Sequence, residues 1–240
     1  HPGLKAIIQM DEGAYKMFRH DETHVVVPII RVSDMDWEIL RSQLLKPYMY
    51  EKDEPLYHVG IYETDSANYL YFDIAHIVGD GMTMNILFED LNALYRGDKV
   101  EKESYTLFEY VLEEKDRDSR GLRARDIKYF QGIMKDFRIR KSILNRRDFH
   151  DLDHGENAAL KNRFSRLNLK KVTAFCREHG VSENVLFLTA YNYCIGIFSG
   201  EKDTISTSIH SGRTDGRWAR LAGPLFLTYI FRCTQHPHET

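Results

Sequence analysis

Apolar and polar residues alternate along the chain in two different periods, which predicts a mixture of strands and helices. Apolar or aromatic side chains at every second position are typical of half-buried strands. This period predicts strands at residues 24–30, 57–63 and 69–75. Spacing of three and four residues is typical of amphipathic helices. It predicts helices at residues 34–44 and 83–95.

The second half of the chain shows the same two periods, with clearer ends to its helices. Residues 104–136 have helical spacing throughout. Further along, helices are predicted at residues 169–179 and 185–198, and strands at residues 204–209 and 226–233. Gly180 and Gly200 follow the two later helices and end them, and Ser182 is the expected N-cap of the second.

Residues 137–166 are the least periodic part of the chain. Basic side chains gather at their start and acidic side chains follow. Such a polar, aperiodic stretch is typical of a linker. We therefore expect an N-terminal part at residues 1–136, a linker or irregular segment at 137–166, and a C-terminal part at 167–240.

The chain's clearest candidate for chemistry lies between the strand at 69–75 and the helix at 83–95. His76 directly follows the strand, and Gly79-Asp80-Gly81 then forms a tight turn before Thr83, the expected N-cap of the helix. A loop at a strand end can hold a catalytic side chain rigidly. A neutral imidazole can accept a proton from an attacking amine or hydroxyl near pH 7. His76 is therefore a candidate catalytic residue, with a satisfied core histidine as the alternative.

Asp80 and Gly81 suit supporting roles in that turn. The Asp80 carboxylate is better placed to accept backbone N–H bonds, or to pair with a buried arginine, than to act as the base. Gly81 either takes a positive φ or leaves room for a ligand. Ser211-Gly212-Arg213 follows a predicted strand and is either a surface turn or the source of an arginine that pairs with Asp80.

The composition fits a protein with a sizeable core and a nearly balanced charge. Of 240 residues, 42% are hydrophobic and 29% are charged, and the formal net charge is −3. That balance carries no electrostatic signature of nucleic-acid binding. No apolar run approaches the length of a transmembrane helix, and no signal peptide opens the chain.

Cysteine and histidine usage indicates neither disulfides nor a metal site. Cys176, Cys194 and Cys233 are odd in number and have no paired spacing, which favours a reduced, cytoplasmic protein. The segment 150–154, His-Asp-Leu-Asp-His, has the residue types of metal ligands. It lies in a polar, aperiodic stretch without a third anchored ligand, so we expect a solvated loop and no metal.

Five segments resemble, in the right order, the motifs of one known family. Ala75-His76-Ile77-Val78-Gly79-Asp80-Gly81 resembles the HHxxxDG motif of the condensation domains of nonribosomal peptide synthetases. The other matches are residues 1–6 to HxxLRx, 105–110 to a YxDYA-type segment, 199–213 to SGQxDIxxGxxxxGR and 223–232 to GxFVNTLxxR. Together they cover nearly the whole chain.

Three positions depart from the family pattern. Ala75 stands where the family has its first motif histidine, although the second, here His76, is the functional one in the family. Gly79 replaces the serine before the aspartate. Leu227 stands where the family usually has asparagine, which affects the expected polar contacts to the acceptor.

The resemblance implies a fold and a set of site residues. The fold is α/β, a two-lobed chloramphenicol acetyltransferase-like fold, with an N-terminal lobe at 1–136 and the start of a C-terminal lobe at 167–240. Family members extend much further at the C-terminus, so we expect a truncated portion with an incomplete second lobe. The implied roles are catalysis for His76, structural support for Asp80, Gly81 and Arg213, and substrate binding for Gly79, Gly212 and Thr228.

The implied reaction is acyl transfer that forms an amide bond. A thioester donor on one carrier protein reacts with the amine of an aminoacyl acceptor on another, and the domain mainly aligns the two. The resemblance implies phosphopantetheine-tethered substrates, peptidyl carrier domains upstream and downstream, an adenylation domain, and no cofactor, metal, nucleic acid or membrane bound directly. We expect low activity from the isolated portion.

Two other functions remain open from the sequence. A stand-alone acyltransferase of the same superfamily would use a coenzyme A thioester with the same histidine chemistry. A non-catalytic docking module is the other, and Ala75 and Leu227 favour it.

Overall fold

A computed structural model describes residues 1–21, 25–50, 54–138 and 168–235 of the chain. Its contacts define two compact units, which are described separately below. Unit 1 is His1–Arg123 with His210–Leu227, and unit 2 is Ala124–Ile209 with Thr228–Thr240. Most of the predicted linker at 137–166, including the segment 150–154, lies outside the described residues, so the predicted domain boundaries stay predictions.

Unit 1 begins with a hairpin that the sequence pattern did not predict. A 3-10 turn, η1 (Pro2–Lys5), leads into β1 (Ala6–Asp11), which pairs antiparallel with β2 (Ala14–Arg19). Glu12 and Gly13 make the connection with φ values of 50° and 78°. Left-handed backbone at both turn positions matches the twist of the flanking strands.

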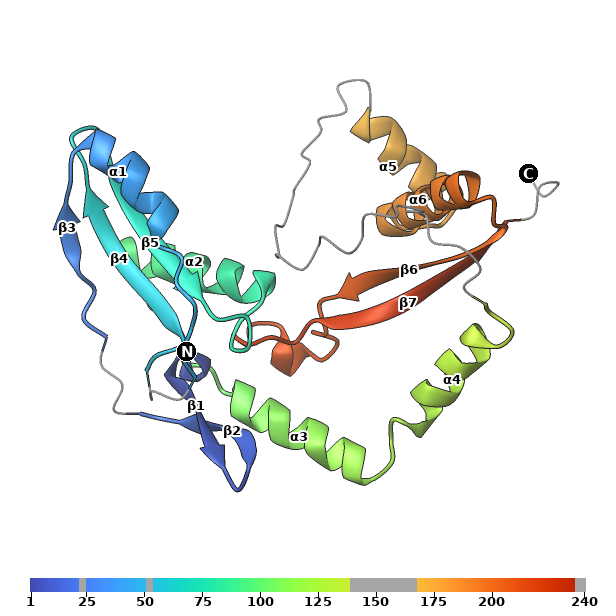
Figure 1. Cartoon of the computed structure of the whole chain (residues 1–240), viewed down its shortest axis with the longest axis horizontal. Coiled ribbons are helices and arrows are strands. Elements are labelled where there is room, and N and C mark those ends of the chain that lie inside the picture. The colour runs from blue at the N-terminus through green and yellow to red at the C-terminus, as the bar shows by residue number, and fades with distance from the viewer. Residues whose placement is uncertain (22–24, 51–53, 139–167, 236–240) are drawn as a thin grey trace, which may run out of the picture. The chain divides into compact units, whose positions relative to one another are not determined.

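The sheet that precedes His76 has three strands in the order β3-β4-β5 (Figure 1). β3 (Ile29–Arg31) runs parallel to β4 (Tyr57–Glu63), and β4 pairs antiparallel with β5 (Asn68–Ile74). The two longer strands match their predicted positions to within one residue. The strand predicted at 24–30 is wrong in extent, because only its last two residues enter β3 and Pro28 just before them offers no N–H to a ladder.

Helix α1 covers this sheet and is shorter than the pattern predicts. α1 (Asp34–Leu40) begins at Ser33, whose side chain caps the N–H of Asp36, and a 3-10 turn, η2 (Arg41–Gln43), follows it. Its buried Trp37 packs against two strand tyrosines, with its ring centroid 4.9 Å from that of Tyr62 and 4.7 Å from that of Tyr69. These contacts fix the helix on the sheet.

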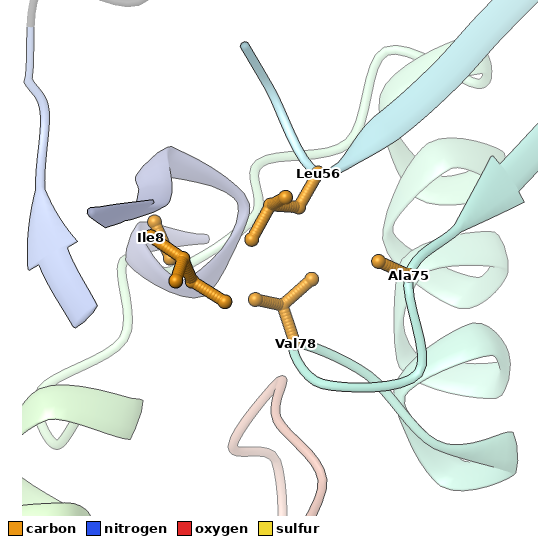
Figure 2. Packing of buried hydrophobic residues seen from close by; sticks show 5 residues of the cluster. Ile8, Leu56, Ala75 and Val78 are labelled. Atoms are coloured by element: carbon orange, nitrogen blue, oxygen red, sulfur yellow. The ribbon is translucent and has the colours of Figure 1, made fainter. Parts of the chain in front are cut away.

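Two apolar clusters form the core of unit 1. Figure 2 shows Ile8 of β1, Leu56, Ala75 and Val78 pointing toward one another, and Ala6 belongs to the same cluster. The second cluster joins α3 (Leu107–Ser119) to the segment that returns from residue 210. Its members are Leu107, Trp218, Leu221 and Leu225. The first cluster thus includes Ala75 and Val78 of the turn that follows β5.

Helical spacing at residues 104–136 corresponds to two helices rather than one. α3 ends near Gly121, which has a φ of 66°, and α4 (Ala124–Met134) begins unit 2. α3 starts from a capping box between Thr106 and Glu109. A left-handed glycine interrupts the helical backbone here, and the spacing of apolar residues does not reveal that break.

Unit 2 contains the remaining helices and the two-stranded sheet β6-β7. α5 is Leu169–Glu178, α6 is Glu183–Ser199, β6 is Asp203–His210 and β7 is Leu227–Thr234. Ser182 caps α6 as predicted, and Gly200 ends it with a φ of 71°. The last residue of β6 and the first of β7 belong to unit 1, so this sheet leads into the segment that carries Arg213.

Arg232 ties β7 to two other parts of unit 2. Its guanidinium binds Asp203 of β6, with Nη2 2.6 Å from Oδ2, and donates to the carbonyls of Ile133 and Lys135 at the end of α4.

Among the described residues, no helix is both long and apolar enough to cross a bilayer.

Candidate functional site

His76 lies on an exposed turn between β5 and α2 (Gly81–Tyr95). The N–H of Val78 donates to the Ala75 carbonyl at 2.9 Å, which closes the turn, and Ala75 donates to Leu56. Ala75 and Val78 are buried, whereas His76 is exposed. The alternative of a satisfied core histidine is therefore wrong, because the buried positions of the turn are Ala75 and Val78, whereas His76 and Ile77 are exposed.

The imidazole of His76 faces an aromatic ring that the sequence analysis did not single out. The His76 and Phe226 ring centroids are 5.1 Å apart and their planes are tilted by 54°. Phe226 lies inside the segment 223–232 matched to a family motif, but nothing in the sequence indicates that it meets His76. The contact depends on the fold that returns residues 210–227 to unit 1.

Asp80, not Thr83, is the N-cap of α2. Its carboxylate accepts the N–H of Thr83 at 2.8 Å, and the Thr83 hydroxyl accepts the N–H of Asp80 at 3.2 Å. The prediction of Thr83 as N-cap is wrong by three residues. Thr83 occupies the third helical position instead, where it completes a reciprocal capping box.

Asp80 also forms an ion pair with Arg213, which is one of the two alternatives predicted for that arginine. Nη1 of Arg213 lies 2.9 Å from Oδ2 of Asp80, and Nη2 lies 3.1 Å from Oδ1. The two side chains are only 4% and 5% exposed, for Arg213 and Asp80 respectively. This bidentate, buried geometry excludes the alternative of Arg213 in a solvated surface turn.

The pair is embedded in a network that holds the segment 221–225 against the start of α2. Arg213 donates to the carbonyls of Leu221 and Gly223, each at 3.0 Å. Leu225 donates its N–H to Oδ2 of Asp80 at 3.1 Å, and Gly223 donates its N–H to the Thr83 hydroxyl at 3.0 Å. The turn that carries His76 is thereby joined to residues about 140 positions later in the chain.

This network keeps Asp80 ionised. Burial by itself raises the pKa of the carboxyl group, but hydrogen bonds from Arg213 and Thr83 outweigh it, and the pKa lies below its ordinary value. A carboxylate that is fully occupied by donors and has a lowered pKa is a poor base. Its surroundings support the structural role predicted for it.

The three glycines predicted for the site differ in how much room their surroundings leave for a side chain. Gly212 has a φ of 72°, and a Cβ there would lie 1.6 Å from the Leu225 carbonyl oxygen. A Cβ on Gly79 would lie 2.7 Å from Ile74. Gly81 is the first residue of α2 and does not have a positive φ, so the alternative of a left-handed backbone at this position is wrong. A Cβ on Gly81 would meet open space.

The predicted site residues do not all fall in one unit. His76, Gly79, Asp80, Gly81, Gly212 and Arg213 belong to unit 1. Thr228, near the start of β7, is exposed and belongs to unit 2. Their catalytic and binding roles stay predictions.

A polar cavity elsewhere in unit 1 shares none of these residues. It measures about 650 Å³, and its wall includes His1, Asp90, Glu103 and Arg220. Nδ1 of His1 lies 2.7 Å from Glu103, and Nε2 lies 3.0 Å from Asp90. Hydrogen bonding to Glu103, with a smaller effect of Asp90, raises the pKa of His1 against the effect of burial.

Within the described ranges, no group of three or more His, Cys, Asp and Glu side chains could hold a metal ion.

The similarities to known proteins agree with this arrangement. Bacitracin synthase 3 of Bacillus licheniformis is 21% identical over 245 residues, an alignment covering 99% of this chain and 4% of the synthase. The first condensation domain of the CDA synthetase superposes with a TM-score of 0.71 at 17% identity, over 99% of this chain and 59% of that one. The epimerization domain from the third module of tyrocidine synthetase B superposes with a TM-score of 0.74 at 16% identity, over 100% of this chain and 58% of that one.

These solved structures confirm the expected α/β, chloramphenicol acetyltransferase-like fold, and the chain spans just under three fifths of their length. The family model for the condensation domain matches residues 1–240, the entire chain. We conclude that the chain belongs to the condensation domain family.

Proposed function

We propose that the protein to which this chain belongs forms amide bonds by acyl transfer from a carrier-bound thioester to the amine of a carrier-bound aminoacyl group. The observation that carries this proposal is the exposed His76, held on a short turn whose two ends are fixed by core packing and by the buried Asp80–Arg213 pair. A rigid, accessible imidazole beside a helix start fits the role of aligning an amine for attack.

The reaction needs little from the protein beyond alignment. The acceptor nitrogen attacks the thioester carbonyl carbon, the C–S bond breaks, and the donor thiol leaves with a proton while the amine loses one. His76 accepts or hydrogen-bonds the amine proton during the attack. Asp80 takes no part in proton transfer, since its oxygens are occupied by Arg213, Thr83 and Leu225.

Ala75 does not weaken this proposal, although the family has histidine there. Its side chain is 3% exposed and packs with Ile8, Leu56 and Val78 in the core (Figure 2). Position 75 therefore faces away from the surface on which His76 lies. A non-catalytic docking module gains little support from this replacement, because the missing imidazole would point into apolar packing.

The rest of the proposed machinery follows from the family. Donor and acceptor arrive on phosphopantetheine arms of peptidyl carrier domains upstream and downstream, with an adenylation domain as a further neighbour, and the condensation domain binds no cofactor itself. Gly79, Gly212 and Thr228 are proposed to line the substrate path. The similarity to bacitracin synthase 3 and to a domain of tyrocidine synthetase B supports antibiotic biosynthesis as the role, and a cytoplasmic location is proposed with it.

The test is His76→Ala in the intact synthetase, with amide formation between two loaded carrier domains measured in a single turnover. We expect a loss of about 10²-fold or more, the scale of a positioned acid–base group. His179→Ala is the matched control, because His179 is also exposed and also meets one aromatic ring, that of Phe175 at 4.2 Å. Unchanged turnover in His76→Ala would overturn the proposal.

A donor swap separates the proposal from a stand-alone acyltransferase. The same acyl group is offered either on the carrier domain or on coenzyme A. We expect the carrier-bound donor to react much faster. Equal rates for both donors would favour the coenzyme A-dependent enzyme.

A further inference from the structure

We propose that Phe226 is a positioning residue whose ring holds the His76 imidazole in the orientation that presents a ring nitrogen to the acceptor amine. The inference rests on the proposed function, because it concerns how the same histidine is held. It assigns a role to a residue that makes no hydrogen bond to any group of the reaction.

The contacts of the His76 imidazole support this role. In the part of the chain that the structure describes, the ring of Phe226 is the contact found for the His76 side chain, and no hydrogen bond to it is found there. Exposed side chains otherwise change rotamer within picoseconds to nanoseconds. A centroid distance of 5.1 Å with planes tilted by 54° is a favourable arrangement for two aromatic rings, so the contact selects one orientation of the imidazole.

The backbone beside Phe226 is fixed to the same turn. Leu225, the preceding residue, is 1% exposed and donates its N–H to Asp80. Asp80 caps the helix that follows His76, so the ring and the imidazole are attached to one hydrogen-bonded frame. A ring on such a frame can hold a neighbouring side chain in place, which a ring on a freely moving loop could not.

The chemistry of the Phe226 ring also suits this role. An orienting carboxylate or carbonyl would occupy one imidazole nitrogen and alter its basicity. The Phe226 ring offers no hydrogen-bonding group, so it orients the imidazole and leaves both nitrogens available. The acceptor amine can then meet a neutral imidazole whose position is already set, which reduces the entropy lost on alignment.

The experiment compares Phe226→Leu and Phe226→Tyr in the intact synthetase with loaded carrier domains. Phe226→Leu keeps apolar bulk and removes the ring, whereas Phe226→Tyr keeps the ring. We expect Phe226→Leu to lower kcat by roughly 3- to 10-fold, equal to about 0.7–1.4 kcal/mol, with the KM for the acceptor nearly unchanged. Phe226→Tyr should recover most of that loss.

Phe88→Leu is the matched control, because Phe88 is 42% exposed and Phe226 is 37% exposed in the same unit. Thermal unfolding of each variant shows whether a loss of turnover comes from a loss of fold. An unchanged kcat in Phe226→Leu, beside an inactive His76→Ala, would overturn the positioning role and leave the proposed function standing. Equal losses in Phe226→Leu and Phe226→Tyr would also overturn it, because the ring would then not be what matters. Full activity of His76→Ala would instead overturn the proposed function.

Discussion

Replacing Asp80 with alanine should destabilise unit 1 far more than the loss of one exposed charge would. The change removes both carboxylate bonds to Arg213, the cap on Thr83 and the acceptor for Leu225. It leaves a guanidinium that is 4% exposed with backbone carbonyls as its acceptors. Breaking a buried pair in this way costs about 3–5 kcal/mol, and loss of the cap puts Asp80→Ala near the upper end.

Tryptophan fluorescence during urea unfolding measures this prediction directly. The chain has two tryptophans, Trp37 and Trp218, and both lie in unit 1. Their signal therefore reports the unit that contains the pair, while unit 2 contributes none. Asp80→Asn is the matched variant, since asparagine is also a good N-cap and retains one neutral acceptor, and it should cost less, about 1–3 kcal/mol.

The pH dependence gives a second measurement with a defined sign. Because the pKa of Asp80 is lower in the folded protein than its ordinary value of 3.8, its contribution is present above that pH and disappears as the pH falls through the folded value. The stability difference between the native protein and Asp80→Asn should therefore shrink below about pH 3.8. A loss below about 1 kcal/mol for Asp80→Ala, or a difference that stays constant into acid, would refute the reasoning.

Two further changes test other contacts of the fold. Gly212→Ala should cost about 1–3 kcal/mol in the same fluorescence assay, because alanine strains the left-handed backbone and meets the Leu225 carbonyl, whereas Gly81→Ala should change stability by less than about 1 kcal/mol. Equal effects of the two would contradict the geometry. Arg232→Met should cost about 1–3 kcal/mol and speed amide hydrogen exchange in β6 and β7, because Asp203 and two carbonyls lose their donor. Lys135→Met serves as its control, since Lys135 contributes only its carbonyl, and a similar acceleration there would contradict the assignment.

Local periodicity was enough to predict the elements whose faces differ in burial. β4 is predicted at its observed bounds, and in its second half the buried Gly60 and Tyr62 alternate with less buried neighbours. α6 was predicted with its cap because Ser182 and Gly200 mark its ends. The hairpin of β1 and β2 was missed because most side chains of β2 are exposed and the first three of β1 are all buried, so neither strand alternates.

The candidate site was predictable in its residues but not in its geometry. The sequence places His76 after a strand, but its exposure depends on Ala75 and Val78 filling the core beside it. Asp80 and Thr83 are both residue types that suit an N-cap. Only the observed start of α2 shows that Asp80 is the cap and that Thr83 is the third helical residue of the capping box. Phe226 has no signature of its own, because its role requires a fold that brings two distant segments together.

The division of unit 1 into two stretches of sequence has a consequence for the order in which the protein is made. Asp80 and Arg213 are separated by 133 residues, and most of unit 2 is encoded between them. At about 5–20 residues per second, a ribosome takes roughly 7–27 s to add that stretch. During this interval the first part of unit 1 has neither its arginine nor Leu221 and Leu225, so the apolar Leu107 lacks much of its cluster. The surface around His76 is therefore completed only after most of unit 2 has been synthesised, by a segment to which no catalytic group is assigned.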